Sequence, residues 1–109
     1  MDVQEQERGR VLVLRGRLDA RSAPDVRQSL HRVVDTGAGE VLLEVSGLVL
    51  VDVSSLGLLL EAHRRAERAG RRLVLVGVPG PLERMLRVTR LDRVLHRVER
   101  PALPEAATA

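Results

Sequence analysis

A short polar break interrupts an apolar run in the segment VDVSSLGLLL, residues 51–60. The break places the acid Asp52 beside two hydroxyl-bearing residues, Ser54 and Ser55, directly before a leucine-rich stretch. Residues of these types begin helices, where unpaired backbone N–H groups and the positive end of the helix dipole favour negative charge. A phosphate on Ser54 would be stabilised there. The segment therefore indicates either a plain helix cap or a serine that another protein modifies.

Motifs of catalytic serines, bound nucleotides and metals do not match the chain. It contains neither G-x-x-x-x-G-K nor G-x-G-x-x-G, and its serine pair lacks the upstream glycine of a nucleophile elbow. Cysteine and lysine are absent, and the histidines have no metal-ligand spacing. One of them, His63, continues a leucine stripe, which is typical of a residue at the edge of the core. We therefore expect a protein that is not an enzyme and that binds no cofactor or metal.

The composition narrows the classes of partner. The chain has 109 residues, enough for one domain with one core, and no aromatic Phe, Tyr or Trp on which bases could stack. Its net charge is only +3, and Glu67 interrupts the basic stretch HRRAERAGRR, as in a solvated helix face. No apolar stretch approaches the roughly 20 residues of a membrane span. We therefore expect a soluble, cytoplasmic protein without a nucleic-acid or membrane partner.

Short apolar runs predict three strands, at residues 11–14, 41–45 and 73–76. They are rich in valine and hardly alternate, which is typical of strands covered on both faces in a parallel sheet. Residues 2–7 alternate weakly, and the turn ERG at their end predicts an antiparallel edge strand. Residues 94–98 fit either a final strand or a short helix.

Helical patterns fill the intervals between the strands. The first helix is expected to begin at Ser22 as N-cap and to end before the GAG segment at 37–39. The second begins within DVSS and ends near Gly70, which suits a left-handed C-terminal position. The third runs from about Pro81 to Val88. The apolar faces of the first two helices are formed by Val26, Leu30, Val33, Val34, Leu56, Leu59, Leu60 and His63.

The order β-β-α-β-α-β-α predicts an α/β fold. We expect a single domain, residues 1–100, with a mixed, mostly parallel sheet of four to five strands and helices packed against it. Residues 101–109, PALPEAATA, are small and proline-containing, and we expect them to form a disordered tail.

Three segments of the chain resemble the STAS domain family, in particular the small bacterial anti-sigma factor antagonists. They are GRLDARSAPDVRQSL, LLEVSGLVLVDVSSLGLLLEAHRRAERAGRRLVLVG and PGPLERMLRVTRLDRVL, within residues 11–98. Two family patterns, G-x-L-D…A-P and D-S-S/T-G-L-G, are matched by Gly16, Leu18, Asp19, Ala23, Pro24, Asp52, Ser54, Leu56 and Gly57. Val53 and Ser55 depart from the second pattern, standing where the family has a serine and a glycine.

The resemblance implies partner switching. In the family, the unphosphorylated antagonist binds an anti-sigma factor with serine kinase activity, which releases the sigma factor. Phosphorylation blocks this binding, and a PP2C-type phosphatase restores it. Carried onto this chain, the phosphorylated residue is Ser54, and the partner-binding residues around it are Asp19, Asp52, Val53, Ser55, Leu56 and Gly57.

The departures from the family pattern leave alternatives open. A side chain at Ser55 is expected to crowd the approach of a kinase, and its hydroxyl is a rival acceptor. The chain could then be a STAS scaffold or subunit that is not phosphorylated, in a stressosome-like or lipid-transport assembly. A small-ligand or nucleotide-binding STAS domain is a further alternative, although the sequence contains no phosphate cradle.

Overall fold

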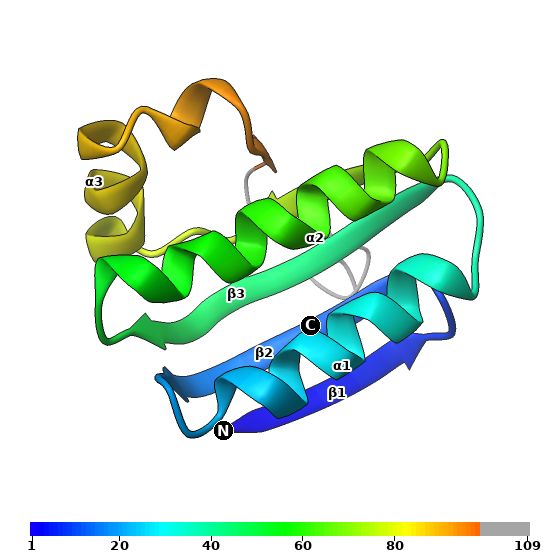
Figure 1. The fold of residues 1–109 in the computed structure, drawn as a ribbon, viewed down its shortest axis with the longest axis horizontal. Helices are drawn as coiled ribbons and strands as arrows, with labels where there is room; N and C mark the ends of the chain where they lie inside the picture. Colours follow the sequence, from blue (N-terminus) through cyan, green and yellow to red (C-terminus); the bar gives the residue numbers. More distant parts are fainter. Residues whose placement is uncertain (99–109) are drawn as a thin grey trace, which may run out of the picture.

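The sheet has five strands in sequence order, β1-β2-β3-β4-β5, in a computed structural model that describes residues 1–98 (Figure 1). The strand β1 is antiparallel to β2, and all other neighbours are parallel. The strands are β1 (Asp2–Glu7), β2 (Val11–Leu18), β3 (Glu40–Leu50), β4 (Arg72–Val76) and β5 (His96–Val98). The helices are α1 (Ala23–Asp35), α2 (Leu56–Arg68) and α3 (Gly80–Val88), with 3-10 turns η1 (Val53–Ser55) and η2 (Leu91–Arg93). The expected α/β fold with a mixed sheet is confirmed.

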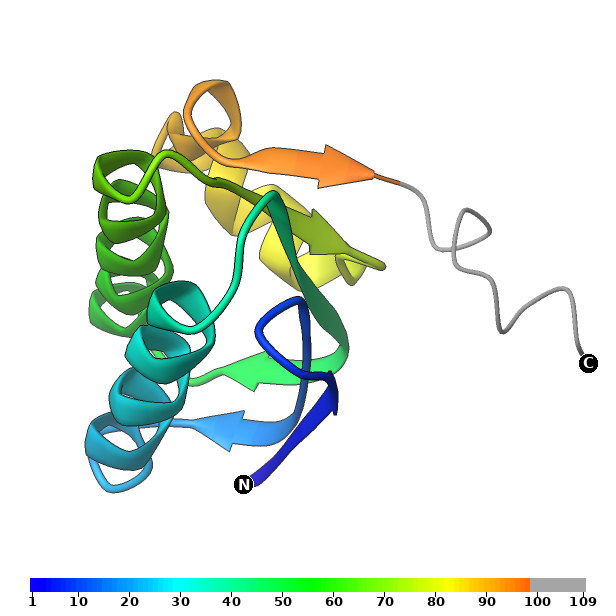
Figure 2. The ribbon, with the colours of Figure 1, turned by 90° about the vertical axis from the view of Figure 1, so that its right-hand side faces the viewer.

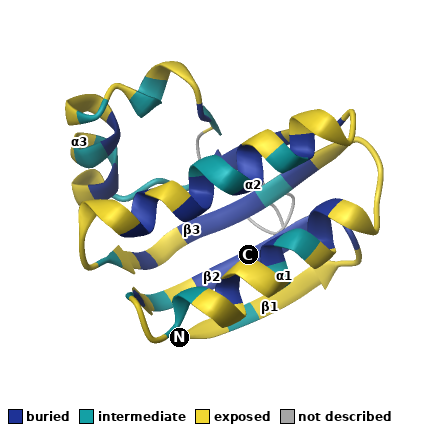
Figure 3. Cartoon of the chain, in the orientation of Figure 1, coloured by how far each residue is buried: buried dark blue, intermediate teal, exposed yellow. Residues whose placement is uncertain are grey.

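The helices α1 and α2 lie side by side over one face of the sheet (Figures 1 and 2). Right-handed crossovers between consecutive parallel strands place their helices on the same face in this way. The surfaces of α1 and α2 that face the sheet are buried, and their outer surfaces are exposed (Figure 3). Both helices begin at the carboxyl ends of the strands before them, so the segments after β2 and β3 share one edge of the sheet.

Residues 11–14 of β2 and 73–76 of β4 are buried on both faces, as their sequences predict, whereas β2 continues past the expected 11–14 to Leu18 with Arg15 and Arg17 exposed. In each strand, leucines belong to the core beneath the helices, and the valines between them point to the other side and are also buried. The buried residues of the two strands are Val11, Leu12, Val13, Leu14, Leu18, Leu73, Val74, Leu75 and Val76. The strand β3 extends past the expected 41–45 to Leu50, and its last residues pair only with β2. This extension carries the chain to the edge where α2 begins.

Several sequence expectations need correction at the level of single residues. Ser22 occupies the N-cap position of α1 but makes no side-chain cap; its hydroxyl lies 3.1 Å from the carbonyl oxygen of Arg17. On α2, Leu58 is buried and Leu60 only half-buried, so the buried stripe is displaced from the expected one. Gly70 has φ 72°, as expected after α2. The open question at 94–98 is resolved as a strand after the turn η2.

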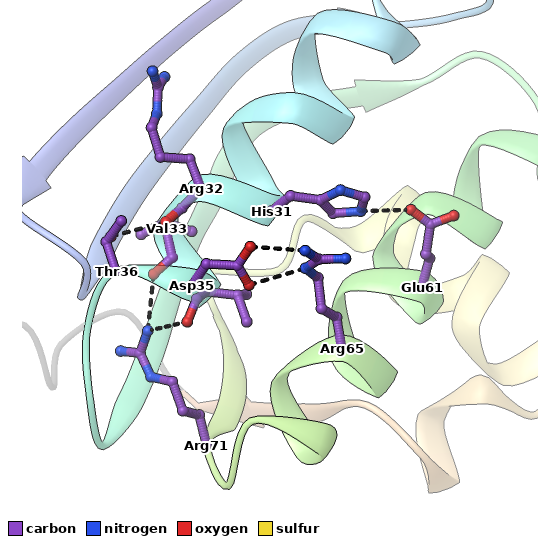
Figure 4. Close-up of polar contacts among 9 residues, drawn as sticks. His31, Arg32, Val33, Asp35, Thr36, Glu61, Arg65 and Arg71 are labelled. Carbon is purple, nitrogen blue, oxygen red and sulfur yellow. Dashed lines mark hydrogen bonds and ion pairs between the residues drawn. The ribbon is translucent and has the colours of Figure 1, made fainter.

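The guanidinium of Arg71 is buried at the other end of the sheet, where α1 ends. Its Nη1 donates to the carbonyl oxygens of Val33 (2.8 Å) and Val34 (2.9 Å), and its Nε donates to that of Gly39 (2.9 Å; Figure 4 shows the first two). Its Nη2 also donates to the carbonyl of Gly9. Burial lowers the pKa of this arginine. One cation therefore satisfies the last carbonyls of α1 and ties them to the β1–β2 turn.

Within residues 1–98, no helix has both the length and the apolar character needed to cross a bilayer. In the same range, no cluster of three or more His, Cys, Asp or Glu side chains could hold a metal ion. The expectation for residues 101–109 lies outside the described residues.

Candidate functional site

The two segments singled out by the sequence meet at the carboxyl edge of the sheet. Leu18, the last residue of β2, pairs with Leu50, the last residue of β3. The N–H of Val51 then donates to the carbonyl of Leu18 at 3.2 Å, which holds the two outgoing chains together. As a result, the loop after β2, which begins at Asp19, lies beside the DVSS segment. The carboxyl edge of parallel strands is where α/β proteins usually place their sites.

Asp52 caps the start of the helical segment with one carboxylate oxygen. Its Oδ1 accepts from the backbone N–H of Ser55 (2.9 Å), and it lies 2.7 Å from Oγ of Ser54 and 2.9 Å from Oγ of Ser55. Asp52 itself is extended, with φ −149° and ψ 170°, as an N-cap residue should be. The hydroxyl of Ser54, followed by the N–H and hydroxyl of Ser55, lowers the pKa of this carboxyl. The site therefore holds a fixed negative charge directly beside Ser54.

The two serines differ in exposure although both hydroxyls contact Oδ1 of Asp52. Ser54 is exposed, and its hydroxyl contacts the carboxylate of Asp52. Ser55 is only 9% exposed, and its Oγ lies 3.2 Å from the carbonyl oxygen of Leu18 and 2.9 Å from Asp52. Ser55 therefore crowds the surface less than the sequence suggests, and its hydroxyl already contacts two acceptors. It ties the site segment to the end of β2. Which of the two hydroxyls is modified stays a prediction.

Asp19 forms the turn between β2 and α1. Its Oδ1 accepts from the backbone N–H of Arg21 (3.0 Å) and of Ser22 (3.1 Å), and these contacts, the N–H of Ser22 most strongly, lower its pKa. This is the Asx-type turn that the sequence allowed as a plain structural role. The same side chain also lines the pocket beside Ser54, so the structure brings the two segments together.

A pocket of about 260 Å³ lies between the starts of α1 and α2. Its wall includes Asp19, Asp52 and Ser54, and also two residues that sequence reasoning missed, Arg27 and Glu61. Nε of Arg27 lies 3.2 Å from Oε1 of Glu61. The pocket therefore contains carboxylates from three segments and one guanidinium.

The carboxylate of Glu61 has a second partner on α1. The same Oε1 lies 2.8 Å from Nε2 of His31 (Figure 4). No signal in the sequence indicates these contacts, because they join residues 30 and 34 positions apart on two different helices.

The remaining residues of the motif divide between surface and core. Val53 is 58% exposed beside Ser54. Gly57 is exposed and lines the pocket, and a Cβ added there would meet no atom within 4 Å. Leu56 is only 1% exposed and packs in the core, so it holds the segment in place and offers no surface.

A second pocket, of about 220 Å³, lies between the end of β3 and the start of α3. It is lined by residues 46–50 and by Pro79, Pro81, Leu82 and Met85. None of these side chains is charged, so this pocket lacks the groups that hold a nucleotide phosphate. It gives no support to the nucleotide-binding alternative.

The comparisons with known proteins agree with this architecture. Residues 1–98 match the family model described as "Mlab, STAS domain". No curated protein matches the sequence. Similar solved structures include the anti-sigma factor antagonist SpoIIAA in its unphosphorylated form, with 19% identity, coverage of 98% of this chain and 91% of that chain, and a TM-score of 0.73.

Two further solved structures are similar over most of their length. One is the Bacillus cell fate determinant SpoIIAA in its phosphorylated form, with 21% identity, coverage of 98% and 95%, and a TM-score of 0.70. The other is a STAS domain protein from Planctomyces limnophilus, with 20% identity, coverage of 99% and 97%, and a TM-score of 0.75. At these identities the likeness shows the fold, and the family match covers all the described residues. The chain belongs to the STAS domain family.

Proposed function

We propose that this chain is an anti-sigma factor antagonist whose binding to an anti-sigma factor is switched by phosphorylation of Ser54. One observation carries the proposal: the Ser54 hydroxyl is exposed and held 2.7 Å from an ionised Asp52, while the neighbouring hydroxyl of Ser55 is turned inward. The existence of a similarly folded antagonist in both unphosphorylated and phosphorylated forms adds support. In this role the chain acts in the cytoplasm as a substrate and binding partner and supplies no catalytic residue.

Asp52 is a positioning residue for the modification. The hydrogen of the Ser54 hydroxyl points to Oδ1 of Asp52, so the lone pairs of Oγ face solvent, from which a kinase would present ATP. In the transfer, Oγ forms a bond to the γ-phosphorus, the bond to ADP breaks, and the hydroxyl proton is lost to a base or to water. Oδ1 of Asp52 already accepts three hydrogen bonds, so we assign Asp52 the role of orienting Oγ of Ser54.

A phosphate on Ser54 changes the electrostatics of the surface. It adds about −1.5 to −2 charges to a pocket in which three carboxylates, Asp19, Asp52 and Glu61, already outnumber one guanidinium, that of Arg27. It also replaces the hydroxyl donor with acceptors, so the contact between Ser54 and Asp52 becomes repulsive. Burying such a group in an interface costs on the order of several kcal/mol unless cations meet it. We therefore expect the phosphorylated form to lose its partner.

The surface around Ser54 suits a partner that packs closely. Val53 offers an exposed apolar side chain next to Ser54 in sequence, and Gly57 leaves open space where a side chain would stand. Asp19 adds a fixed charge to the pocket. We propose that the anti-sigma factor, which is also the serine kinase, docks on this surface, and that a PP2C-type phosphatase acts on the same serine.

The test combines phosphorylation with binding. Purified anti-sigma factor kinases are incubated with the chain and ATP, and the modified residue is mapped by mass spectrometry. We expect one phosphate on Ser54, none in Ser54→Ala, and an unchanged yield in Ser55→Ala, which serves as the matched control. Modification of Ser55 in the unsubstituted chain would overturn the assignment.

A second candidate function has one observation in its favour. The matching family model is described as an MlaB-type STAS domain and not as an anti-sigma factor antagonist. In that case the chain is a stably bound subunit of a stressosome-like or lipid-transport assembly. A stable complex whose affinity is the same for the unsubstituted chain and for Ser54→Asp would favour this role over the switch.

A further inference from the structure

Arg27 is the cation that lines the pocket beside Ser54. Among the described residues of the pocket wall, every other charged side chain is a carboxylate. Arg27 reaches this pocket from α1, whereas Ser54 reaches it from the η1 turn, and the side chain of Arg27 is 47% exposed. An arginine and a modifiable serine therefore line the same small pocket, and a phosphate on the serine would turn them into an oppositely charged pair.

The present partner of Arg27 is replaceable. Only its Nε contacts Glu61, at 3.2 Å, and neither Nη group forms a hydrogen bond within residues 1–98. Exposed pairs of this kind contribute about 0–1 kcal/mol. Glu61 keeps a closer partner, since Nε2 of His31 lies 2.8 Å from the same oxygen. The His31 contact is also the larger cause of the lowered pKa of Glu61. Release of Arg27 therefore leaves Glu61 paired.

We propose that Arg27 is a phosphate-binding residue: once Ser54 is phosphorylated, its guanidinium leaves Glu61 and holds the phosphate in the pocket between α1 and α2. The proposal rests on the phosphorylation of Ser54 proposed above. A phosphate monoester presents three strong acceptor oxygens, and the two free Nη groups match them in a bidentate geometry. Without Arg27, the phosphate would face only the carboxylates of the pocket.

This contact would change the phosphorylated form of the chain even when no partner is bound. With the phosphate drawn toward α1, Asp52 loses its contact with Ser54 but still accepts the N–H of Ser55, so the helix start persists. The bound guanidinium favours the dianionic phosphate and shields it from a phosphatase. Arg27 thereby prolongs the lifetime of the phosphorylated form.

The test uses the full chain with phosphoserine incorporated genetically at position 54, so that no kinase is needed. The second phosphate pKa is measured by ³¹P NMR titration in the unsubstituted chain, in Arg27→Gln and in Arg32→Gln. Arg32 is a matched control on the same helix: it is exposed, it forms no ion pair within the described chain, and its side chain points away from the α1–α2 contacts (Figure 4). We expect Arg27→Gln to raise this pKa by about 0.5 unit, and Arg32→Gln to leave it unchanged.

Two further outcomes sharpen the result. Arg27→Lys should restore only part of the shift, because an ammonium keeps the charge without the fork. Equal pKa values in Arg27→Gln and the unsubstituted chain, or equal rises in Arg27→Gln and Arg32→Gln, would overturn the proposal. Failure of the proposed function can be told apart from failure of this proposal. It would appear as unchanged partner binding by the phosphorylated chain, whatever the phosphate pKa in the ³¹P titration.

Discussion

Oγ of Ser54 lies 2.7 Å from Oδ1 of Asp52, and that same oxygen accepts the backbone N–H of the next residue. One carboxylate therefore caps the helical segment and orients the hydroxyl that we propose is phosphorylated. These contacts show the structural role of the DVSS segment, and its functional role stays a prediction.

The first prediction concerns pH. The pKa of Asp52 is lowered in the folded chain, so its contribution to stability is complete above the ordinary carboxyl value of about 3.9 and is lost as the pH falls through the lower folded value. We expect the amide signals of Ser54 and Ser55 to titrate with a midpoint below 3.9 in an NMR pH series. Ser54→Ala should move this midpoint upward, because the Ser54 hydroxyl is the largest cause of the shift. A midpoint unaffected by this substitution would exclude the proposed contact.

The second prediction separates the two serines by stability. Ser55→Ala removes the inward hydroxyl contacts to Leu18 and Asp52, and we expect it to lower the free energy of unfolding by about 1 kcal/mol. Ser54→Ala changes an exposed side chain, and its effect should stay within about 0.5 kcal/mol. Urea denaturation of both variants measures the difference. Equal losses would mean that both hydroxyls have the same structural role.

The third prediction uses the open backbone at Gly57. Because nothing lies within 4 Å of an added Cβ, Gly57→Ala should preserve the fold and raise stability by up to about 1 kcal/mol through helix propensity. Partner affinity should fall at least about tenfold if the anti-sigma factor packs against this position. Gly80→Ala is the matched control, an exposed glycine at the start of α3 whose added Cβ comes no closer than 3.7 Å to a neighbouring atom. Equal affinities for both variants would place the interface elsewhere.

The fourth prediction concerns Arg71, which donates to carbonyls from α1 and from the β1–β2 turn. Arg71→Met leaves these buried acceptors without a donor, and we expect a loss of about 3 kcal/mol in the free energy of unfolding. Arg72→Met, at the next and exposed position, should cost less than about 0.5 kcal/mol. Thermal and chemical denaturation compare the two, and similar costs would show that the buried contacts do not stabilise the fold.

The fifth prediction concerns the end of α3. Arg90 has φ 63°, the one non-glycine residue of the described chain with a positive φ, and it follows the last turn of α3. A side chain is strained in this conformation by about 1 kcal/mol, which glycine avoids. Arg90→Gly should therefore raise the melting temperature. A decrease would indicate that the arginine side chain makes a stabilising contact.

Local patterns were sufficient to predict most of the fold. Valine-rich runs identified the strands, and Gly70 marked the end of α2 with the expected left-handed conformation. The length of β3 was missed because Ser46 and Gly47 interrupt its apolar run, and glycine weakens the strand pattern. Ser22 occupies the expected N-cap position, but its side chain forms no cap, and the turn is closed by Asp19.

The candidate site was only partly predictable. The contact between Asp52 and Ser54 could be predicted because the two residues are close in the chain. It could not assign Ser55 to the interior, since a hydroxyl at a helix start fits either side, and the carbonyl of Leu18 that it contacts lies 37 positions away. Arg27 was missed for the same reason, because its pocket exists only once α1 and α2 lie side by side.

The most direct measurement of the central claim is the affinity of an anti-sigma factor for the chain with phosphoserine at position 54, compared with the unmodified chain, by isothermal titration calorimetry. A desolvation cost of several kcal/mol predicts binding at least about 100-fold weaker for the phosphorylated form. Affinities that agree within about twofold would contradict the account, because the added phosphate would then have no effect on docking.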